Sequence, residues 1–372
     1  MRPAGAIKRP SIPAALVASG AVRRVIPLLI LGLPVAVAAR LLHGPEWIIF
    51  LGSALALLPL ASWIGLGTEH AAVRVGSSVG GLLNATFGNA AELIITIFAL
   101  RRGLVDLVKA SITGSIIGNT LLILGLSAFV GGRKHGTQRF QVKPAGRHAA
   151  MMILAVSAMA LPAVFATVEK DAFVREEVSI GVSILLLGTY VAYILYSYFS
   201  RRVREDEKGV EDVHHPPGKP WSLRKSMLVL GAAVVGTAVA SEMLVHGIES
   251  VSKTLGLSHF FLGLIVVPLV GNVAEHYSAI EFAARNRMEL ALSIAANSST
   301  QIAVFVALLL VLISLLFHPM DLIFQPIEVI TLFASTAIFA YISLDGETNW
   351  LEGVQLLALY LIAAVSFFFL PG

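Results

Sequence analysis

The chain contains no cysteine and few charged residues. Without cysteine it has no disulfides, no thiolate metal sites and no cysteine nucleophiles. Only 13% of its 372 residues are charged and 56% are hydrophobic, whereas soluble domains carry about 25% charged residues. Lipid is therefore the expected solvent for most of the chain. No basic stretch is interleaved with aromatic residues, so no nucleic acid partner is expected.

Long apolar runs predict an all-α polytopic membrane protein. A membrane-spanning helix needs about 20 apolar residues, and an open strand edge is not tolerated in hydrocarbon. Eleven runs fit, at residues 25–42, 46–67, 77–100, 104–130, 148–168, 178–200, 225–246, 259–283, 288–317, 321–343 and 351–370. The first run is expected to be a retained helix rather than a signal peptide, because another apolar run follows it instead of a polar mature region.

Basic residues predict the orientation. With the N-terminus in the cytoplasm, 20 of the 27 Lys and Arg residues fall on the cytoplasmic side, as the positive-inside rule requires. The lack of a targeting segment and the small size favour the inner (plasma) membrane of a prokaryote, with membrane lipids as neighbours, and an organelle membrane is the alternative. The predicted organisation is an N-terminal segment with one helix (1–45), a first repeat (46–200), a cytoplasmic linker of acidic and basic residues (201–222) and a second repeat (223–372).

An internal repeat is the strongest feature of the sequence. When Glu92 is aligned with Glu275, the stretch 80–115 aligns with the stretch 263–298 without a gap, and Gly-Asn-Ala-Ala-Glu at 88–92 falls on Gly-Asn-Val-Ala-Glu at 271–275. The two copies lie in the third and eighth predicted spans. Because they are an odd number of spans apart, they cross the membrane in opposite directions. The sequence thus predicts two inverted five-helix repeats plus an extra N-terminal helix, an architecture that places the binding site of many secondary transporters at the midplane.

Glu92 and Glu275 are the candidate ion-binding residues. Each lies near the middle of its span, where a carboxylate is costly and normally faces a cavity or the interior of the bundle. Gly88 and Gly271, four residues earlier, permit a local helix break that frees carbonyl oxygens, and Asn89 and Asn272 add amide oxygens on the same face. An all-oxygen site of this kind suits Ca²⁺.

The spans that follow each motif are polar on one side. Ser115 and Asn119 are spaced by one helical turn in the fourth span, and Ser298 and Gln301 lie at related positions in the ninth. We expect these four residues to support the site, although small polar residues also mediate plain helix packing. His276 is a candidate proton relay, and Glu242 a candidate ion or proton path. Glu69, Glu328 and Asp345 lie near span ends and are expected at the membrane interface.

Exchange follows from electrostatics. Burial favours the protonated form of a carboxyl group, whereas a divalent cation favours the charged form. Protons and Ca²⁺ would then compete for the same two carboxylates. If the empty, doubly charged site does not reorient, movement of one ion requires return of the other. No cofactor is needed beside the transported ions.

At these residues the sequence resembles the calcium/proton exchanger family of the calcium/cation antiporter superfamily. The resemblance rests on the stretches 81–93, 114–119, 271–276, 298–301 and 349–353. It implies eleven helices, Ca²⁺ export from the cytoplasm in exchange for H⁺, and Glu92 and Glu275 as the residues that bind both ions. Similar family members trimerise, so the resemblance implies that this protein could also form a homo-oligomer.

Alternatives remain open from sequence alone. The transported ion could instead be Mn²⁺, exchanged for H⁺, because it also prefers oxygen ligands. A Na⁺/Ca²⁺ exchanger is a second alternative, although that branch has a Ser-rich Pro-Glu motif where this chain has Gly-Asn-x-x-Glu. A cation channel is a different class, which would conduct without obligatory counter-ion movement. An enzyme is not expected, because there is no His-Glu-x-x-His motif and no pair of intramembrane aspartates.

Overall fold

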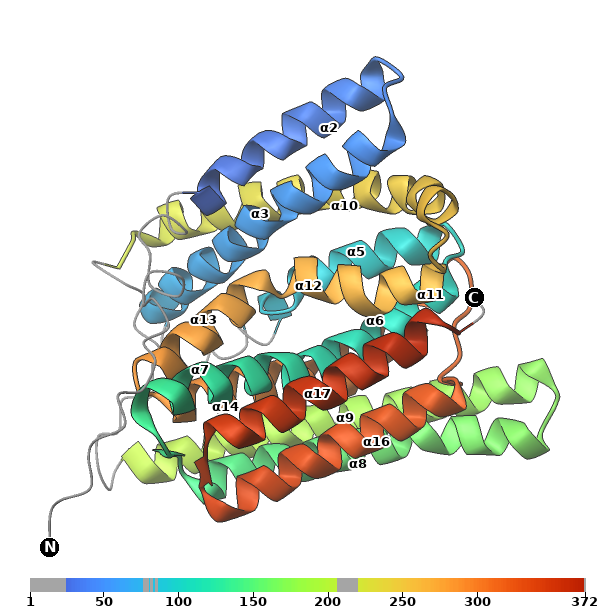
Figure 1. Cartoon of the computed structure of the whole chain (residues 1–372). Helices are drawn as coiled ribbons and strands as arrows, with labels where there is room; N and C mark the ends of the chain where they lie inside the picture. The colour runs from blue at the N-terminus through green and yellow to red at the C-terminus, as the bar shows by residue number, and fades with distance from the viewer. Residues whose placement is uncertain (1–24, 76–79, 81–82, 84–85, 206–219, 371–372) are drawn as a thin grey trace, which may run out of the picture.

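The computed structural model describes the chain apart from residues 1–24, 76–79, 81–82, 84–85, 206–219 and 371–372 (Figure 1). Most of the predicted linker, and the first 24 residues of the predicted N-terminal segment, therefore lie outside the described residues. The regular secondary structure of the described part consists of helices and two strands of two residues each.

The elements of the first half are η1 (Ile26–Leu31), α2 (Gly32–Leu41), α3 (Glu46–Val75), α5 (Ala90–Arg101), α6 (Val105–Ile117), η2 (Gly118–Ile123), α7 (Leu124–His135), β1 (Gln138–Arg139), α8 (Val142–Val168) and α9 (Ala172–Glu205). Those of the second half are α10 (Leu223–Leu255), α11 (His259–Phe261), η3 (Leu262–Val266), α12 (Val267–Gly271), α13 (Val273–Ala284), α14 (Met288–Gln301), η4 (Ile302–Val306), α15 (Ala307–Ser314), α16 (Pro326–Asp345), β2 (Glu347–Thr348) and α17 (Trp350–Phe368).

The two strands form a small antiparallel sheet between the halves. Gln138 of β1 pairs with Thr348 of β2, and Arg139 pairs with Glu347. Both strands lie in connections between helices, outside the apolar spans. The sheet therefore does not conflict with the rule that only helices or closed barrels cross hydrocarbon.

The repeat seen in the sequence is also a repeat of structure. In the alignment that places Glu92 on Glu275, the ends of α5, Ala90 and Arg101, fall on the ends of α13, Val273 and Ala284. The same alignment places the π-helical turn η2 on the π-helical turn η4, apart from one position at its start. Figure 1 shows α5 and α13 running from the middle of the molecule toward opposite ends. The predicted all-helical membrane fold with two repeats is confirmed.

Among the described residues, eight helical stretches are long and apolar enough to span a membrane, and a ninth is the bent pair His259–Gly271 and Val273–Ala284. The first predicted span is a shorter apolar helix, Ile26–Leu41. The third predicted span, 77–100, lies partly outside the described residues, and its described helix is α5. Helix boundaries also differ, because several helices continue well past the apolar run, as α9 and α10 do.

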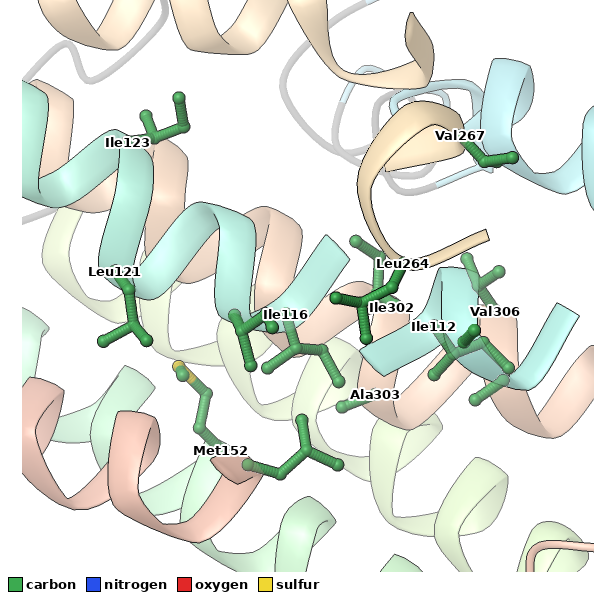
Figure 2. Packing of buried hydrophobic residues seen from close by; sticks show 14 of the residues in the cluster. Ile112, Ile116, Leu121, Ile123, Met152, Leu264, Val267, Ile302, Ala303 and Val306 are labelled. Atoms are coloured by element: carbon green, nitrogen blue, oxygen red, sulfur yellow. The ribbon is translucent and has the colours of Figure 1, made fainter. Parts of the chain in front are cut away.

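The two spans that follow the repeated motif form the centre of the bundle. In the continuous helix Val105–His135, 83% of an apolar stretch of 18 residues is buried inside the protein. The corresponding share in Ala172–Tyr196, at the periphery, is 22%. Figure 2 shows Ile112 and Ile116 of α6 packed with Leu264 of η3 and Ile302 of η4. Gly114 allows α6 to approach η3 closely, because a Cβ atom at this position would collide with the carbonyl oxygen of Leu264.

Candidate functional site

The candidate site begins at two helix breaks. Asn89 precedes α5 with φ −104° and ψ 21°, and Asn272 precedes α13 with φ −105° and ψ 10°. The chain bends by 64° between α12 and α13. Glu92 and Glu275 consequently lie in the first turn of α5 and α13, where the positive end of the helix dipole favours a carboxylate.

Glu92 is enclosed by groups from both halves. Its side chain is almost fully buried, with 3% of the residue exposed. Oε1 accepts hydrogen bonds from the hydroxyl of Ser115 and, at 2.5 Å, from Nδ2 of Asn272. Oε2 is buried and has no hydrogen-bond partner among the described residues. One carboxylate oxygen therefore remains available for a cation or a proton.

Gly271 provides the space that Glu92 occupies. A Cβ atom at position 271 would lie 2.6 Å from Cγ of Glu92, whereas Cα and Cβ of Glu92 are at 3.7 Å. The contact is therefore confined to the outer part of the Glu92 side chain. Each half contributes to the site of the other here, because Gly271 and Asn272 belong to the second repeat and Glu92 to the first.

Glu275 has a more open environment than Glu92. The residue is half-buried, and the side chain of Ser298 interacts with its carboxyl group. Its Oε2 atom is buried and has no hydrogen-bond partner in the described part of the chain. The two glutamates are close enough for their charges to interact. The same residue type in the two repeats thus has two different surroundings.

A chain of amide and hydroxyl groups surrounds the two glutamates. Nδ2 of Asn89 donates to Oε1 of Gln301 at 2.7 Å, and Nδ2 of Asn119 donates to Oγ of Ser298 at 2.9 Å. The Ser298 hydroxyl in turn donates to Oδ1 of Asn89 at 3.4 Å. Three of the supporting residues predicted from the sequence spacing, namely Asn119, Ser298 and Gln301, are therefore hydrogen-bonded in one group with Asn89. The fourth, Ser115, bonds with Asn272 to Glu92.

Three predicted residues lie outside this network. Gly88 is in the turn that precedes α5. His276 is 8% exposed, and no described residue forms a hydrogen bond with its buried Nε2 atom. Glu242 forms an ion pair with Arg40 of α2 at 3.5 Å. The relay and path roles of His276 and Glu242 stay predictions.

Glu328 lies in the first turn of α16, at a span end as the sequence predicts. It is buried by other parts of the protein, with 1% exposed, and its place at the membrane interface stays a prediction. Its Oε1 accepts from Thr113 at 2.8 Å, and its Oε2 accepts from the backbone of Gln325 at 2.8 Å, closing a capping box at the start of α16. The Gln-Pro-x-Glu sequence at 325–328 signals such a cap, although it gives no hint of the partner Thr113.

The donor set suits a hard cation that binds and leaves. Its members are carboxylate, amide and hydroxyl oxygens, which Ca²⁺ prefers. In the part of the chain that the structure describes, no group of three or more His, Cys, Asp or Glu residues could hold a metal ion. Two carboxylates with neutral oxygens are appropriate for a transported substrate, because transport requires release as well as binding.

Two inverted repeats with a glutamate at each helix break, Glu92 buried and Glu275 half-buried, define a secondary transporter rather than an enzyme. A family model described as sodium/calcium exchanger protein matches residues 45–199 and 225–369. The chain belongs to this family.

Relatives of this chain include a Ca²⁺/H⁺ antiporter, ChaA, of Bacillus subtilis, 40% identical over 341 residues that cover 91% of this chain and 97% of the relative. A Ca²⁺/H⁺ antiporter of Synechocystis sp. is 39% identical and covers 91% and 95% of the two chains. The solved structure of native YfkE superposes with a TM-score of 0.81 at 39% identity, covering 93% of this chain and all of YfkE. The H⁺/Ca²⁺ exchanger CAX, at 18% identity and a TM-score of 0.73, shares the fold.

Proposed function

We infer that this protein is a Ca²⁺/H⁺ antiporter in which Glu92 and Glu275 bind Ca²⁺ and protons in turn. The observation that carries the site assignment is the position of both glutamates at symmetry-related helix breaks, beside amide and hydroxyl side chains of both halves. The assignment of ions is supported by relatives of 40% and 39% identity that cover nearly the whole chain.

The geometry suggests how competition arises. Within the part of the chain that the structure describes, Glu92 and Glu275 each have a buried oxygen without a hydrogen-bond partner, so each oxygen can take a proton or contribute to a cation site. Two negative charges at this depth are costly unless an ion neutralises them. The empty site is therefore the state least able to cross between the two orientations, and exchange becomes obligatory. Asn89, Asn272, Ser115 and Ser298 complete the oxygen cage around the ion.

We propose further that Ca²⁺ leaves the cytoplasm through this site and that the protein resides in a prokaryotic plasma membrane. The asymmetry of Lys and Arg supports a cytoplasmic N-terminus. Figure 1 places the α7–α8, α13–α14 and α16–α17 connections at one end of the bundle and the α8–α9 and α10–α11 connections at the other, consistent with that assignment. Contact with membrane lipids follows from the apolar outer helices. The homo-oligomer stays a prediction.

The test is ⁴⁵Ca²⁺ accumulation in proteoliposomes that are acidic inside, comparing the wild type with Glu92→Gln and Glu275→Gln. Each substitution removes a charge with little change of size, so we expect uphill uptake to vanish in both. Glu249→Gln, at an exposed position of α10, is the matched control and should transport normally. Uptake that persists in either site variant would refute the assignment of the glutamates.

The same vesicles distinguish the alternatives. Uptake that ignores the pH gradient and follows a Na⁺ gradient would indicate Na⁺/Ca²⁺ exchange. Mn²⁺ that competes with Ca²⁺ at equal concentration would indicate a broader cation specificity. A Ca²⁺ current without counter-ion movement would indicate a channel.

A further inference from the structure

The C-terminal ends of the two glutamate-bearing helices are built alike. After α5 the chain turns at Gly103, with φ +73°, and after α13 at Asn286, with φ +61°. The backbone N–H of Leu104 bonds to the carbonyl of Ala99 at 3.0 Å, and that of Arg287 to the carbonyl of Phe282 at 2.9 Å. These are left-handed helix caps, and the two turns occupy equivalent positions in the alignment of the repeats.

Each of these ends accepts a hydrogen bond from a histidine of the opposite half. His318, in the segment after α15, bonds through Nδ1 to the carbonyl oxygen of Leu100 in α5 at 3.1 Å. His135, the last residue of α7, bonds through Nε2 to the carbonyl oxygen of Ala284 in α13 at 2.9 Å. His135 and His318 are themselves equivalent when Glu92 is aligned with Glu275. The sequence analysis missed this pair, although the alignment that defines the repeat also places one histidine on the other.

The two contacts lie at opposite ends of the bundle. Figure 1 shows α13 ending near the end of α7, and α5 ending at the far side near α11. The α13 end has further donors from the first half: Nζ of Lys134 bonds to the Ala284 carbonyl at 2.9 Å, and Nε2 of Gln138 to the Ala283 carbonyl at 2.9 Å. At the α5 end the described donor from the other half is His318.

We propose that His318 and His135 are positioning residues for transport, each fixing one glutamate-bearing helix to the opposite half at one membrane face. The proposal rests on the proposed function of Glu92 and Glu275. Both helices have 12 residues, or about 18 Å at the rise of an α-helix, with the glutamate in the first turn and the cap at the last. A short rigid helix transmits a displacement of one end to the other. The negative end of the helix dipole favours donors at these carbonyls.

Side-chain geometry gives a test with opposite expectations at the two positions. The amide nitrogen of asparagine is bonded to Cγ, as Nδ1 of histidine is, whereas that of glutamine lies one bond further out, comparable to Nε2. His318→Asn should therefore keep the donor and His318→Gln should misplace it. For His135 the order reverses. The His135 variants are made in a Lys134→Met chain, because Lys134 donates to the same carbonyl.

We expect His318→Ala to raise the KM for ⁴⁵Ca²⁺ uptake about three- to tenfold, the effect of losing one hydrogen bond, with Vmax per folded transporter within about twofold. His318→Asn should restore KM and His318→Gln should not. In the Lys134→Met chain, glutamine at position 135 should restore KM and asparagine should not. His43→Asn is the control, because His43 is exposed and has φ +52°, which asparagine tolerates.

A purely structural cap would lower the amount of folded protein, and hence total uptake, without moving KM. That result, or a KM in His318→Ala equal to that of His43→Asn, would overturn the proposal. Equal rescue by asparagine and glutamine would overturn the assignment of donor atoms. The two hypotheses fail in different ways. If the proposed function is wrong, Glu92→Gln will still transport Ca²⁺. If only the role of the histidines is wrong, Glu92→Gln will be inactive and the histidine variants will have a normal KM.

Discussion

Gly271 is the position at which the smallest substitution should do the most to the site. In Gly271→Ala the new methyl group would lie 2.6 Å from Cγ of Glu92, against about 3.4 Å or more for an ordinary contact. Relief requires Cγ of Glu92 to move by about 1 Å, since Glu92 and Gly271 belong to the packed helices α5 and α12, whose backbones cannot easily move apart. Ca²⁺ accepts oxygen ligands at about 2.3–2.6 Å, so a displacement of this size moves the carboxylate from a usable position.

The magnitude follows from the cost of overpacking. One extra methyl group in a well-packed site costs about 1–3 kcal/mol, which corresponds to a loss of Ca²⁺ affinity of about fivefold to about 150-fold. We expect this loss in the KM for ⁴⁵Ca²⁺ uptake under an imposed pH gradient. The backbone of residue 271 is helical, and alanine is a better helix former than glycine, so the amount of folded protein should change little.

Gly118→Ala is the matched control for this prediction. Gly118 is also buried in a central span, but a Cβ atom added there would meet nothing within 4 Å. Its KM should stay within about twofold of the wild type. If Gly271→Ala and Gly118→Ala were indistinguishable in KM, with comparable thermal stability in detergent, then the enclosure of Glu92 by Gly271 would have no role in ion binding, and the reasoning would be refuted.

Two further predictions concern stability and pH. Thr113→Val removes the hydroxyl that donates to buried Glu328. We therefore expect a lower Tm in a fluorescence-detected unfolding assay, equivalent to a loss of about 1–3 kcal/mol in the free energy of unfolding, and an unchanged KM for Ca²⁺. An unchanged Tm would contradict a stabilising role of this hydrogen bond. Ca²⁺ binds deprotonated carboxylates, so the KM for Ca²⁺ should rise as pH falls, by up to about tenfold per pH unit for each displaced proton. The measurement is ⁴⁵Ca²⁺/⁴⁰Ca²⁺ exchange at equal pH on both sides of the membrane. A KM that is independent of pH between 6 and 8 would contradict competition between Ca²⁺ and protons.

The parts of the fold that were predictable are those fixed by local chemistry. The apolar runs, the repeated Gly-Asn-x-x-Glu motif and the helix breaks next to Gly88 and Gly271 all depend on residues near one another in the chain. Lipid allows no irregular backbone outside a protein-lined cavity, so a mid-span break beside a glutamate predicts a site. Equivalent positions in two repeats face the same axis, and the same reasoning therefore placed the serines and amides of the following spans near the glutamates. Their role in ion binding stays a prediction.

The parts that were not predictable depend on contacts between the halves. The sequence does not say that Asn272 donates to Glu92, or that Thr113 meets Glu328 across 215 residues. A repeat defines which residues are equivalent, and it leaves open how the two copies are placed against each other. For the same reason His135 and His318 were visible as an equivalent pair only after their contacts with α13 and α5 were known.

The difference between Glu92 and Glu275 has a cause in the sequence. Asn272 and Ser115 both donate to Glu92, but their equivalents, Asn89 and Ser298, are engaged by two amides that break the symmetry. Asn89 donates to Gln301, whose equivalent position is Gly118, and Ser298 accepts from Asn119, whose equivalent position is Ile302.

Gln301 holds Asn89 in a bond that its equivalent Asn272 does not make, because Asn89 donates to Gln301 whereas Asn272 donates to Glu92. Ser298 still interacts with the carboxyl group of Glu275. Among the described residues, Glu275 therefore keeps the counterpart of the Ser115 contact and lacks the counterpart of the Asn272 bond. The two carboxylates are inequivalent in this conformation, and under the proposed function we expect Glu275, which has fewer donors and is more exposed, to be the one from which an ion is exchanged first.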